Sequence, residues 1–311
     1  MNRFACIFPG QGSQYVGMGK DLCDRFPVAK EIFTLADDLL GFSISGVCFE
    51  GPEETLKQTR YTQVAILVHS VAVWRVLENR LSSADFVAGH SVGEYSALVA
   101  SGALEFKDAL NLVRLRAEAM QQAGERSPGG MAALIGGEEE DINRLLNDLS
   151  QTATVVAANF NSPGQVVISG DIEAIEKATQ IAKDYGVKRA IKLNVSGAFH
   201  SPLMEYAQEK LSLALRETCF EDARIPVVSN VTARPVRSAS EIRELLEKQL
   251  LSPVLWHQSM VYVLNQGIKI FFEVGPGDVL CGLLKRIDQN AVCYGSSSIQ
   301  AIEKLLSEVF Q

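Results

Sequence analysis

The chain has 311 residues, of which 47% are hydrophobic and 21% charged, and its formal net charge is −8. This length and apolar content support one large domain, or a large domain with an insert, and exclude wholesale disorder. The acidic balance argues against nucleic-acid binding, which favours a basic face, but is compatible with a local basic patch that meets an acidic partner.

Predicted strands and helices alternate in the first part of the chain. Buried strands are predicted over residues 3–8 and 84–88. Helical patterns cover residues 16–25, 28–40, 52–58, 62–80, 94–100 and 106–123. Buried strands that alternate with helices predict an α/β fold with a parallel sheet covered on both faces.

The predicted order changes near residues 127–130. The next elements are a strand, a helix, two strands, a helix and a strand, over residues 131–136, 138–150, 153–160, 165–170, 171–186 and 187–195. This order is typical of a ferredoxin-like fold. We therefore expect a small ferredoxin-like domain over 127–195, inserted into a large α/β domain formed by 1–126 and 196–311. The large domain resumes with elements over 202–218, 226–230, 240–251, 268–274 and 299–310.

Cysteine usage and hydropathy predict a cytoplasmic protein that crosses no membrane and binds no metal. The apolar run before Pro9 is too short for a signal peptide, and the most apolar segment, residues 64–76, falls short of a membrane span. No C-x-x-C pair occurs, so we expect neither a zinc site nor a disulfide framework, and we interpret the cysteines as reduced thiols. They are Cys6, Cys23, Cys48, Cys219, Cys281 and Cys293.

Residues 89–93, Gly-His-Ser-Val-Gly, lie between a predicted strand and a predicted helix. The G-x-S-x-G pattern in this context is typical of a nucleophile elbow, a tight turn that lifts the serine hydroxyl above the sheet edge. The flanking glycines allow the turn, and the N-terminus of the next helix favours a developing oxyanion. Ser91 is therefore the candidate nucleophile.

A serine nucleophile needs a base, and the chain has four histidines. His69 lies in an apolar helical stretch and His257 in no motif. His90 adjoins Ser91 on a turn where neighbouring side chains point apart, so it is expected in the wall of the site. His200 lies in a glycine-led loop at the predicted domain junction, where catalytic groups are common, and is the candidate base.

No acid is evident as a third member that would orient His200. Four aspartates between Ser91 and His200 fall in the predicted insert, mostly on solvated helix faces: Asp141, Asp148, Asp171 and Asp184. We therefore predict a Ser–His dyad whose imidazole is held by a neutral group such as a backbone carbonyl.

Arg116 falls in the middle of the apolar stripe of the predicted 106–123 helix, whereas Arg114 points elsewhere. A buried guanidinium is costly unless it is paired. Periodicity leaves two interpretations open: a structural ion pair with an internal carboxylate, or a fork that binds a substrate carboxylate in bidentate fashion.

The glycine-rich loop that contains Gly10 and Gly12 follows the first predicted strand, but it matches no nucleotide-binding pattern. The third glycine of G-x-G-x-x-G is replaced by Tyr15, and Gly19-Lys20 is followed by Asp21 rather than Ser or Thr. These glycines are expected to allow backbone to approach a neighbouring loop or a bound oxyanion.

Taken together, the motifs resemble the malonyl-CoA:acyl-carrier-protein transacylase family over essentially the whole chain. They are residues 8–14 (FPGQGSQ), 89–95 (GHSVGEY), 114–116 (RLR), 161–165 (NSPGQ), 197–201 (GAFHS) and 275–277 (GPG). The resemblance implies a hydrolase-like α/β domain with a ferredoxin-like insert and the site in the cleft between them. The 197–200 motif resembles the malonyl-type signature, although it begins with Gly where modular synthases commonly have His.

The resemblance also implies roles for individual residues. Ser91 would carry the acyl group, and His200 would be its base. The backbone N–H groups of Gln11 and Val92 would form the oxyanion hole, and the backbone of Gln249 would orient His200.

The implied reaction is ping-pong transfer of malonyl from malonyl-CoA, through Ser91, to the phosphopantetheine thiol of an acyl carrier protein in fatty-acid or polyketide synthesis. Arg116 would bind the malonyl carboxylate, and no cofactor is implied. Because the carrier proteins of such pathways are acidic, a basic docking patch is expected, although a solvated face explains each basic cluster equally well. The candidates are Lys188, Arg189 and Lys192, or Lys285 and Arg286.

Two other functions compete with this one. A hydrolase or proofreading thioesterase would send the acyl group to water, but it has no need of the cation that Arg116 supplies. A non-catalytic scaffold or carrier-binding module would tolerate loss of Ser91 or His200, and both are present. We expect a monomer, since the two predicted domains form a self-contained enzyme.

Overall fold

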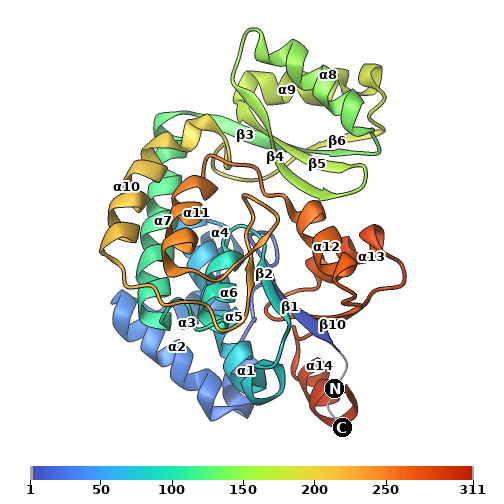
Figure 1. Cartoon of the computed structure of the whole chain (residues 1–311). Helices are drawn as coiled ribbons and strands as arrows, with labels where there is room; N and C mark the ends of the chain where they lie inside the picture. The colour runs from blue at the N-terminus through green and yellow to red at the C-terminus, as the bar shows by residue number, and fades with distance from the viewer. Residues whose placement is uncertain (1–2, 310–311) are drawn as a thin grey trace.

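The computed structural model describes residues 3–309 and contains two β-sheets (Figure 1). The larger sheet has the strand order β10-β9-β1-β2-β7-β8. Neighbouring strands from β10 to β7 are parallel, and the edge strand β8 is antiparallel to β7. The strands are β1 (Phe4–Phe8), β2 (Phe86–Gly89), β7 (Val227–Val228), β8 (Pro235–Val236), β9 (Ile270–Glu273) and β10 (Val292–Gly295). The predicted parallel sheet is confirmed, with an antiparallel strand added at one edge.

Helices cover both faces of this sheet, and β1 shows why it is buried throughout. Phe4, Cys6 and Phe8 face the core shared with α5, α6 and α7, whereas Ala5 and Ile7 face the core shared with α12 and α13. The helices are α1 (Lys20–Arg25), α2 (Pro27–Leu40), α3 (Ile44–Glu50), α4 (Glu53–Leu56), α5 (Thr59–Leu81), α6 (Gly93–Ala100), α7 (Phe106–Arg126), α10 (Glu205–Glu217), α11 (Ala239–Gln249), α12 (Trp256–Asn265), α13 (Val279–Ile287) and α14 (Ile299–Lys304).

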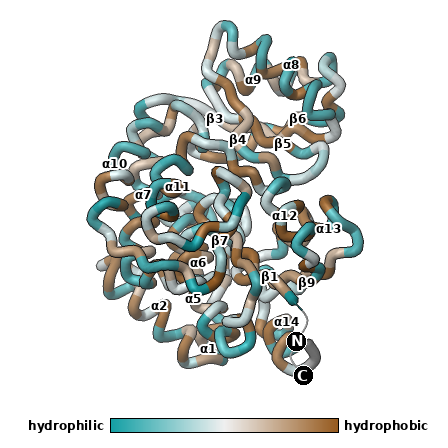
Figure 2. Tube along the Cα trace, in the orientation of Figure 1, coloured by the Kyte–Doolittle hydropathy of each residue, from teal (hydrophilic) through white to brown (hydrophobic). Residues whose placement is uncertain are grey.

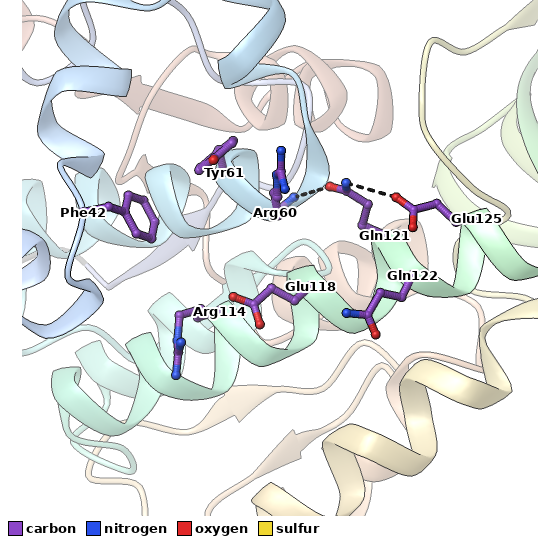
Figure 3. Close-up of a pocket in the computed structure, with 8 residues that line it drawn as sticks. All are labelled: Phe42, Arg60, Tyr61, Arg114, Glu118, Gln121, Gln122 and Glu125. Carbon is purple, nitrogen blue, oxygen red and sulfur yellow. Dashed lines mark hydrogen bonds between the residues drawn. The ribbon is translucent and has the colours of Figure 1, made fainter.

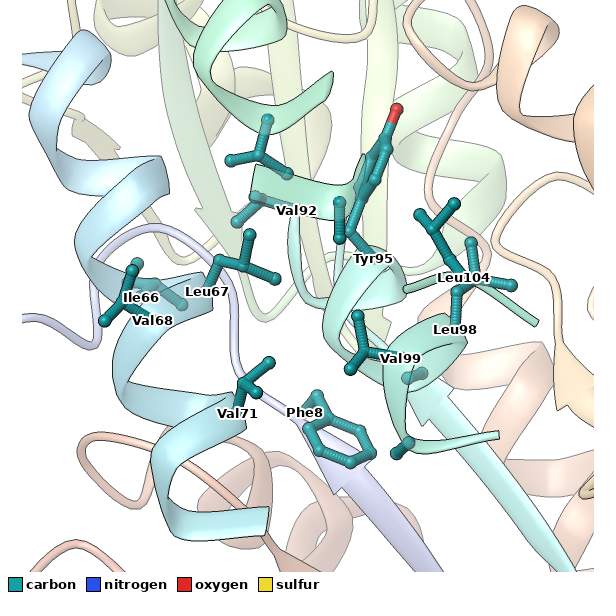
Figure 4. Close-up of a cluster of buried hydrophobic side chains, with 14 of the residues drawn as sticks. Phe8, Ile66, Leu67, Val68, Val71, Val92, Tyr95, Leu98, Val99 and Leu104 are labelled. Atoms are coloured by element: carbon teal, nitrogen blue, oxygen red, sulfur yellow. The ribbon is translucent and has the colours of Figure 1, made fainter. Parts of the chain in front are cut away.

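The long helix α5 is buried along most of its length because α2, α6 and α7 all pack against it. Figure 4 shows Val71 of α5 beside Phe8 of β1, and Leu67 of α5 next to Val92 at the start of α6. Within the described chain, no helix combines the length and apolar character needed to cross a bilayer. The helix α6 is buried at every residue, so the turn that precedes it has a rigid support.

The second sheet lies above the first in Figure 1 and is antiparallel throughout, with the order β4-β5-β3-β6. Its elements are β3 (Gly129–Ile135), α8 (Glu139–Ser150), β4 (Val155–Ser162), β5 (Gln165–Asp171), α9 (Ile172–Ile181) and β6 (Arg189–Lys192). The helices α8 and α9 cover one face and share a separate apolar core with it. Hydrophobic residues run along β5, whereas α8 alternates between hydrophobic and hydrophilic residues (Figure 2). The predicted ferredoxin-like order of elements is confirmed.

Several elements differ from the predicted ones. The helices α3, α12 and α13 and the strands β8 and β10 were not predicted, and α9 ends at 181 before a 3-10 turn, Ala182–Tyr185. The strand β7 covers only two of the predicted residues 226–230, because Asn230 leaves the ladder and hydrogen-bonds near Ser91. Residue 310 of the predicted last helix, like residues 1, 2 and 311 of the predicted large domain, lies outside the described residues.

The expectation that all cysteines are reduced thiols is wrong. Cys281 and Cys293 form a disulfide, with their Cα atoms 5.3 Å apart. The pairing was missed because α13 and β10 were missed: β10 returns beside β9 and brings Cys293 against the helix that carries Cys281. The sulfur atoms lie near the Glu273 carboxylate, but in a disulfide they are not available as thiolate ligands for a metal. The remaining cysteines, Cys6, Cys23, Cys48 and Cys219, are free.

Candidate active site

Ser91 lies on the sharp turn between β2 and α6. Its φ angle is +52°, in the left-handed region that residues other than glycine avoid. Asn230 braces the turn: its Oδ1 accepts a hydrogen bond from the Ser91 N–H at 2.7 Å, and its Nδ2 donates to the Gly89 carbonyl at 2.6 Å. The predicted strand–turn–helix arrangement of the elbow is confirmed.

The two glycines of the elbow permit close packing rather than an unusual φ. A Cβ on Gly89 would lie 2.0 Å from the Gly93 carbonyl, and one on Gly93 would lie 2.2 Å from the Phe8 carbonyl oxygen. A Cβ on Gly10 would likewise lie 2.5 Å from the His90 carbonyl oxygen, so the glycine-rich loop approaches the elbow as expected. The strained conformation falls on Ser91 itself.

Ser91 and His200 are in hydrogen-bond contact, with Ser91 Oγ 2.8 Å from His200 Nε2. His200 Nδ1 lies 3.0 Å from the Gln249 carbonyl oxygen and 3.1 Å from the Ser252 carbonyl oxygen. Carbonyl oxygens only accept hydrogen bonds, so Nδ1 carries the proton and Nε2 is left to accept the Ser91 hydroxyl proton. The predicted neutral partner of the imidazole is therefore present, with Ser252 as a second carbonyl.

His200 also has an unusual backbone and a low pKa. Its φ angle is +56°, so both members of the pair are held in the left-handed region. Burial, and then the positive charge of Arg116, lower the pKa of His200 to about 3. The imidazole is thus neutral at ordinary pH, the state in which it can accept a proton from Ser91.

Arg116 is fully buried on α7, as its place in the apolar stripe predicted, while Arg114 is exposed. Its NH2 group donates to Ser91 Oγ and to Gln249 Oε1, each at 3.0 Å, and its NH1 group donates to Gln63 Oε1 at 2.5 Å. All three acceptors are neutral, and no carboxylate of the described residues forms an ion pair with it. The first interpretation of Arg116, a structural ion pair with an internal carboxylate, therefore does not hold within residues 3–309.

A cavity of about 160 Å³ opens beside Ser91 and His200, and its lining also includes Gln11 and Val92. Neither the Gln11 N–H nor the Val92 N–H has an acceptor among the described residues. Two such groups beside the nucleophile can stabilise an oxyanion. The volume is several times the roughly 30 Å³ that one water occupies, which suits a short acyl group.

His90 lies in the wall of this cavity, as expected. Its Nε2 is 2.8 Å from Asn161 Oδ1 on β4, and its ring packs against Trp256 at 5.5 Å between centroids. Burial, the largest effect, lowers the pKa of His90, so the ring is a neutral bridge between the elbow and the small sheet.

The remaining candidates lie elsewhere. His69 is buried on α5 and His257 is half-buried on α12, and neither lines the cavity. The aspartates of the small sheet and its helices have structural partners: Asp141 caps α8, Asp148 accepts from Tyr185, and Asp171 accepts from the Thr154 N–H. Asp184, exposed after α9, also lies outside the cavity. A dyad without an acid agrees with this placement.

A second hollow lies between α5 and α7, lined by Tyr61, Arg114 and Glu118 among others (Figure 3). Figure 3 shows Gln121 bridging Arg60 and Glu125 along its rim. Its lining mixes both signs of charge and includes neither Ser91 nor His200, so it is separate from the candidate site.

The contacts reveal residues that the sequence analysis missed. Gln63 offered one signal, a polar residue next to a long apolar run on a buried helix. Asn230 and Ser252 lie on loops and had no distinctive sequence pattern. Glu94, in the first turn of α6, belongs to the 89–95 motif, but the sequence analysis assigned it no role. All four contribute hydrogen bonds to the side chains or backbone around Ser91.

Comparison with known proteins places the chain in a family. Residues 5–291 match the family model described as "Acyl transferase domain". A malonyl CoA-acyl carrier protein transacylase of Bacillus subtilis (strain 168) is 43% identical over 304 residues, which are 97% of this chain and 96% of the relative. The chain belongs to the malonyl-CoA:acyl-carrier-protein transacylase family. The family's Escherichia coli (strain K12) member is 43% identical over 288 residues, 92% of this chain and 93% of the relative.

Solved structures of family members have the same fold. A malonyl-transacylase in complex with a type II polyketide synthase acyl-carrier protein is 42% identical and has a TM-score of 0.94, covering 98% of this chain and 99% of that one. An acyl carrier protein S-malonyltransferase from Vibrio cholerae is 42% identical with a TM-score of 0.93, covering 98% of this chain and 100% of that one. Both the resemblance and the predicted fold class are confirmed.

The left-handed backbone at Ser91 generates a prediction about stability. Replacing Ser91 by Gly or by Ala removes the hydroxyl in both cases, but only glycine adopts a φ of +52° without steric cost. We expect Ser91→Gly to exceed Ser91→Ala in free energy of unfolding by about 1 kcal/mol, measured by urea denaturation. Ser96, in the middle of α6, is the matched control, because there the glycine variant should be the less stable of the two. If Ser91→Ala were instead more stable than Ser91→Gly, the left-handed backbone at Ser91 would not be strained.

Proposed function

We propose that this chain transfers a malonyl group from malonyl-CoA to the phosphopantetheine thiol of an acyl carrier protein, through an ester on Ser91, and so supplies extender units for fatty-acid or polyketide synthesis. One observation supports it above the others: a fully buried guanidinium that donates to Ser91 Oγ and has only neutral acceptors. A malonyl group on Ser91 would bring a carboxylate to that cation. The names of the relatives agree with this substrate.

In the first half-reaction, Ser91 Oγ attacks the thioester carbonyl while its proton passes to His200 Nε2. The N–H groups of Gln11 and Val92 would hold the developing oxyanion. When the tetrahedral intermediate collapses, the carbon–sulfur bond breaks and the CoA thiolate takes the proton from His200. The carbonyl oxygens of Gln249 and Ser252 hold the imidazole by its Nδ1–H throughout.

In the second half-reaction, the thiol of the carrier's phosphopantetheine replaces CoA. His200 takes the thiol proton, the sulfur attacks the malonyl ester, and Ser91 recovers the proton as it leaves. Arg116 would hold the malonyl carboxylate and so fix the ester carbonyl against the oxyanion donors. The position of the ester in the cavity beside the elbow favours the tethered thiol over water.

The same proposal covers the partners, the cofactor requirement, the oligomeric state and the domain organisation. The partners are malonyl-CoA and an acyl carrier protein, no cofactor is required, and the enzyme acts as a cytoplasmic monomer. We also assign residues 127–195 to a small domain and 1–126 and 196–311 to a large one, because the small sheet has its own apolar core. The cavity lies between them, since β4 contributes Asn159 and Asn161 and the elbow contributes Ser91.

The fate of a labelled malonyl group tests the proposal. With malonyl-CoA and a phosphopantetheinylated acyl carrier protein, we expect the label on the carrier, measured by intact-protein mass spectrometry. Ser91→Ala and His200→Ala should each reduce the transfer rate by a factor of about 10³ or more. Free malonate as the main product would indicate a hydrolase instead, and unchanged malonyl-CoA would indicate a binding module.

Replacing Arg116 by Ala tests the role of the buried cation. We expect the ratio of kcat/KM for malonyl-CoA to that for acetyl-CoA to fall by about 100-fold, because a charge-assisted hydrogen-bonded pair is lost for one substrate only. Arg114→Ala, on the same helix but exposed, is the matched control and should leave the ratio unchanged. An unaltered ratio in Arg116→Ala would exclude recognition of the malonyl carboxylate by this residue.

A further inference from the structure

Gln249 contacts the active site through two different parts of the residue. Its backbone carbonyl accepts from His200 Nδ1, whereas its side-chain Oε1 accepts from Arg116 NH2 at 3.0 Å. Gln249 is the last residue of α11 and is only 1% exposed. The backbone contact explains how His200 is oriented, and the side-chain contact calls for a separate explanation.

The Gln249 amide is held in one orientation. Its Nε2 donates to Glu94 Oε2 at 2.7 Å and to the Ser91 carbonyl at 3.2 Å. Rotated by half a turn, the amide would present its NH₂ group to the Arg116 guanidinium, donor against donor. Its oxygen would then face a carboxylate and a carbonyl, acceptor against acceptor. Only the observed orientation gives both ends of the Gln249 amide suitable partners.

Glu94 is the residue that imposes this orientation. It lies in the first turn of α6, is 4% exposed, and accepts from Gln249 Nε2 and from the Asn230 N–H. No ion pair involving its carboxylate is found in the described chain, so Gln249 links it to the positive charge of Arg116. Burial raises the pKa of Glu94 to about 7, while its hydrogen bonds and Arg116 oppose the rise. Above that pH it is a carboxylate, which can only accept.

We propose that the side-chain amide of Gln249, oriented by Glu94, is a positioning group that holds the Arg116 guanidinium for the acyl carboxylate. Glu94, Gln249 and Arg116 form a chain of hydrogen bonds, from the guanidinium to the Gln249 oxygen and from the Gln249 nitrogen to the Glu94 carboxylate. This chain fixes one side of the guanidinium, as Gln63 fixes the other. Malonyl selectivity therefore depends on two residues that do not touch the substrate through their side chains. The inference rests on the proposed function.

The test uses Gln249→Met, which keeps the backbone carbonyl toward His200 and removes all three side-chain hydrogen bonds, to Arg116, Glu94 and the Ser91 carbonyl. The rates of Ser91 acylation by malonyl-CoA and by acetyl-CoA are measured separately at pH 8 by rapid quench and intact mass. We expect the malonyl-to-acetyl ratio of kcat/KM to fall about tenfold or more, the loss expected for one hydrogen bond to a charged group. The fall should come from the malonyl rate, because a disturbed His200 would slow both substrates equally.

Glu94→Gln, an isosteric change, keeps the proposal testable if Gln249→Met folds poorly. Its new amide can rotate and no longer dictates the orientation of Gln249, so the ratio should fall, and adding Glu94→Gln to Gln249→Met should lower it no further. Glu273→Gln is the matched control. Glu273 is a buried carboxylate that accepts hydrogen bonds from the N–H groups of Leu280 and Cys281, far along the chain from Ser91. Replacing it by Gln should leave the malonyl-to-acetyl ratio unchanged.

The outcomes separate the inference from the proposed function. No malonyl ester on Ser91 in the unsubstituted chain would overturn both. A malonyl ester with an unchanged ratio in Gln249→Met would overturn the inference alone, as would an equal loss for both substrates. A higher ratio in Glu94→Gln would also overturn it, because Glu94 would then act by repelling the substrate carboxylate rather than by orienting Gln249.

Discussion

The burial of Arg116 without a carboxylate partner is the constraint on which the site depends. Removing a guanidinium from water costs several kcal/mol unless the charge is compensated. The chain meets this cost with the neutral oxygens of Gln63, Gln249 and Ser91, which satisfy hydrogen bonds but bring no charge. A site built in this way gains most from a ligand that brings a negative charge into direct contact with the guanidinium, and an acyl group with a free carboxylate is such a ligand.

The positive charge of Arg116 also affects the protonation of the base, His200. Burial and the field of Arg116 keep His200 neutral, which suits it to accept a proton but opposes the imidazolium that must form during acylation. In the proposed reaction, a malonyl carboxylate paired with Arg116 would cancel part of that field just when His200 becomes charged. An acetyl group would leave the field in place. Selectivity would thus arise in the transition state as well as in binding.

Backbone strain and close packing hold this arrangement together. Ser91 and His200 both occupy left-handed backbone conformations, and Asn230 ties the elbow to the loop after β7. Residues that must adopt such conformations persist only when their surroundings determine them fully. The burial of α6 at every position supplies that support below Ser91.

Much of the fold and of the candidate site could be predicted from the sequence, but only where the residues that form a pattern lie close together in the chain. The elbow, the glycine-rich loop and the burial of Arg116 each follow from residues close together in the chain. The contacts of Gln63, Glu94 and Asn230 do not, because each joins segments far apart and gives no periodic signal. The disulfide was missed for a related reason: Cys281 and Cys293 meet only because α13 and β10 fold back beside β9.

The most direct measurement is a competition for Ser91. The unsubstituted chain is mixed with equal concentrations of malonyl-CoA and acetyl-CoA, without carrier protein, and the acyl group on Ser91 is identified by intact-protein mass spectrometry and peptide mapping. If the unpaired charge of Arg116 selects the acyl group, malonyl will occupy Ser91 almost exclusively. Comparable amounts of acetyl and malonyl esters would contradict that account, since a buried cation facing the acyl group would then contribute nothing to its choice.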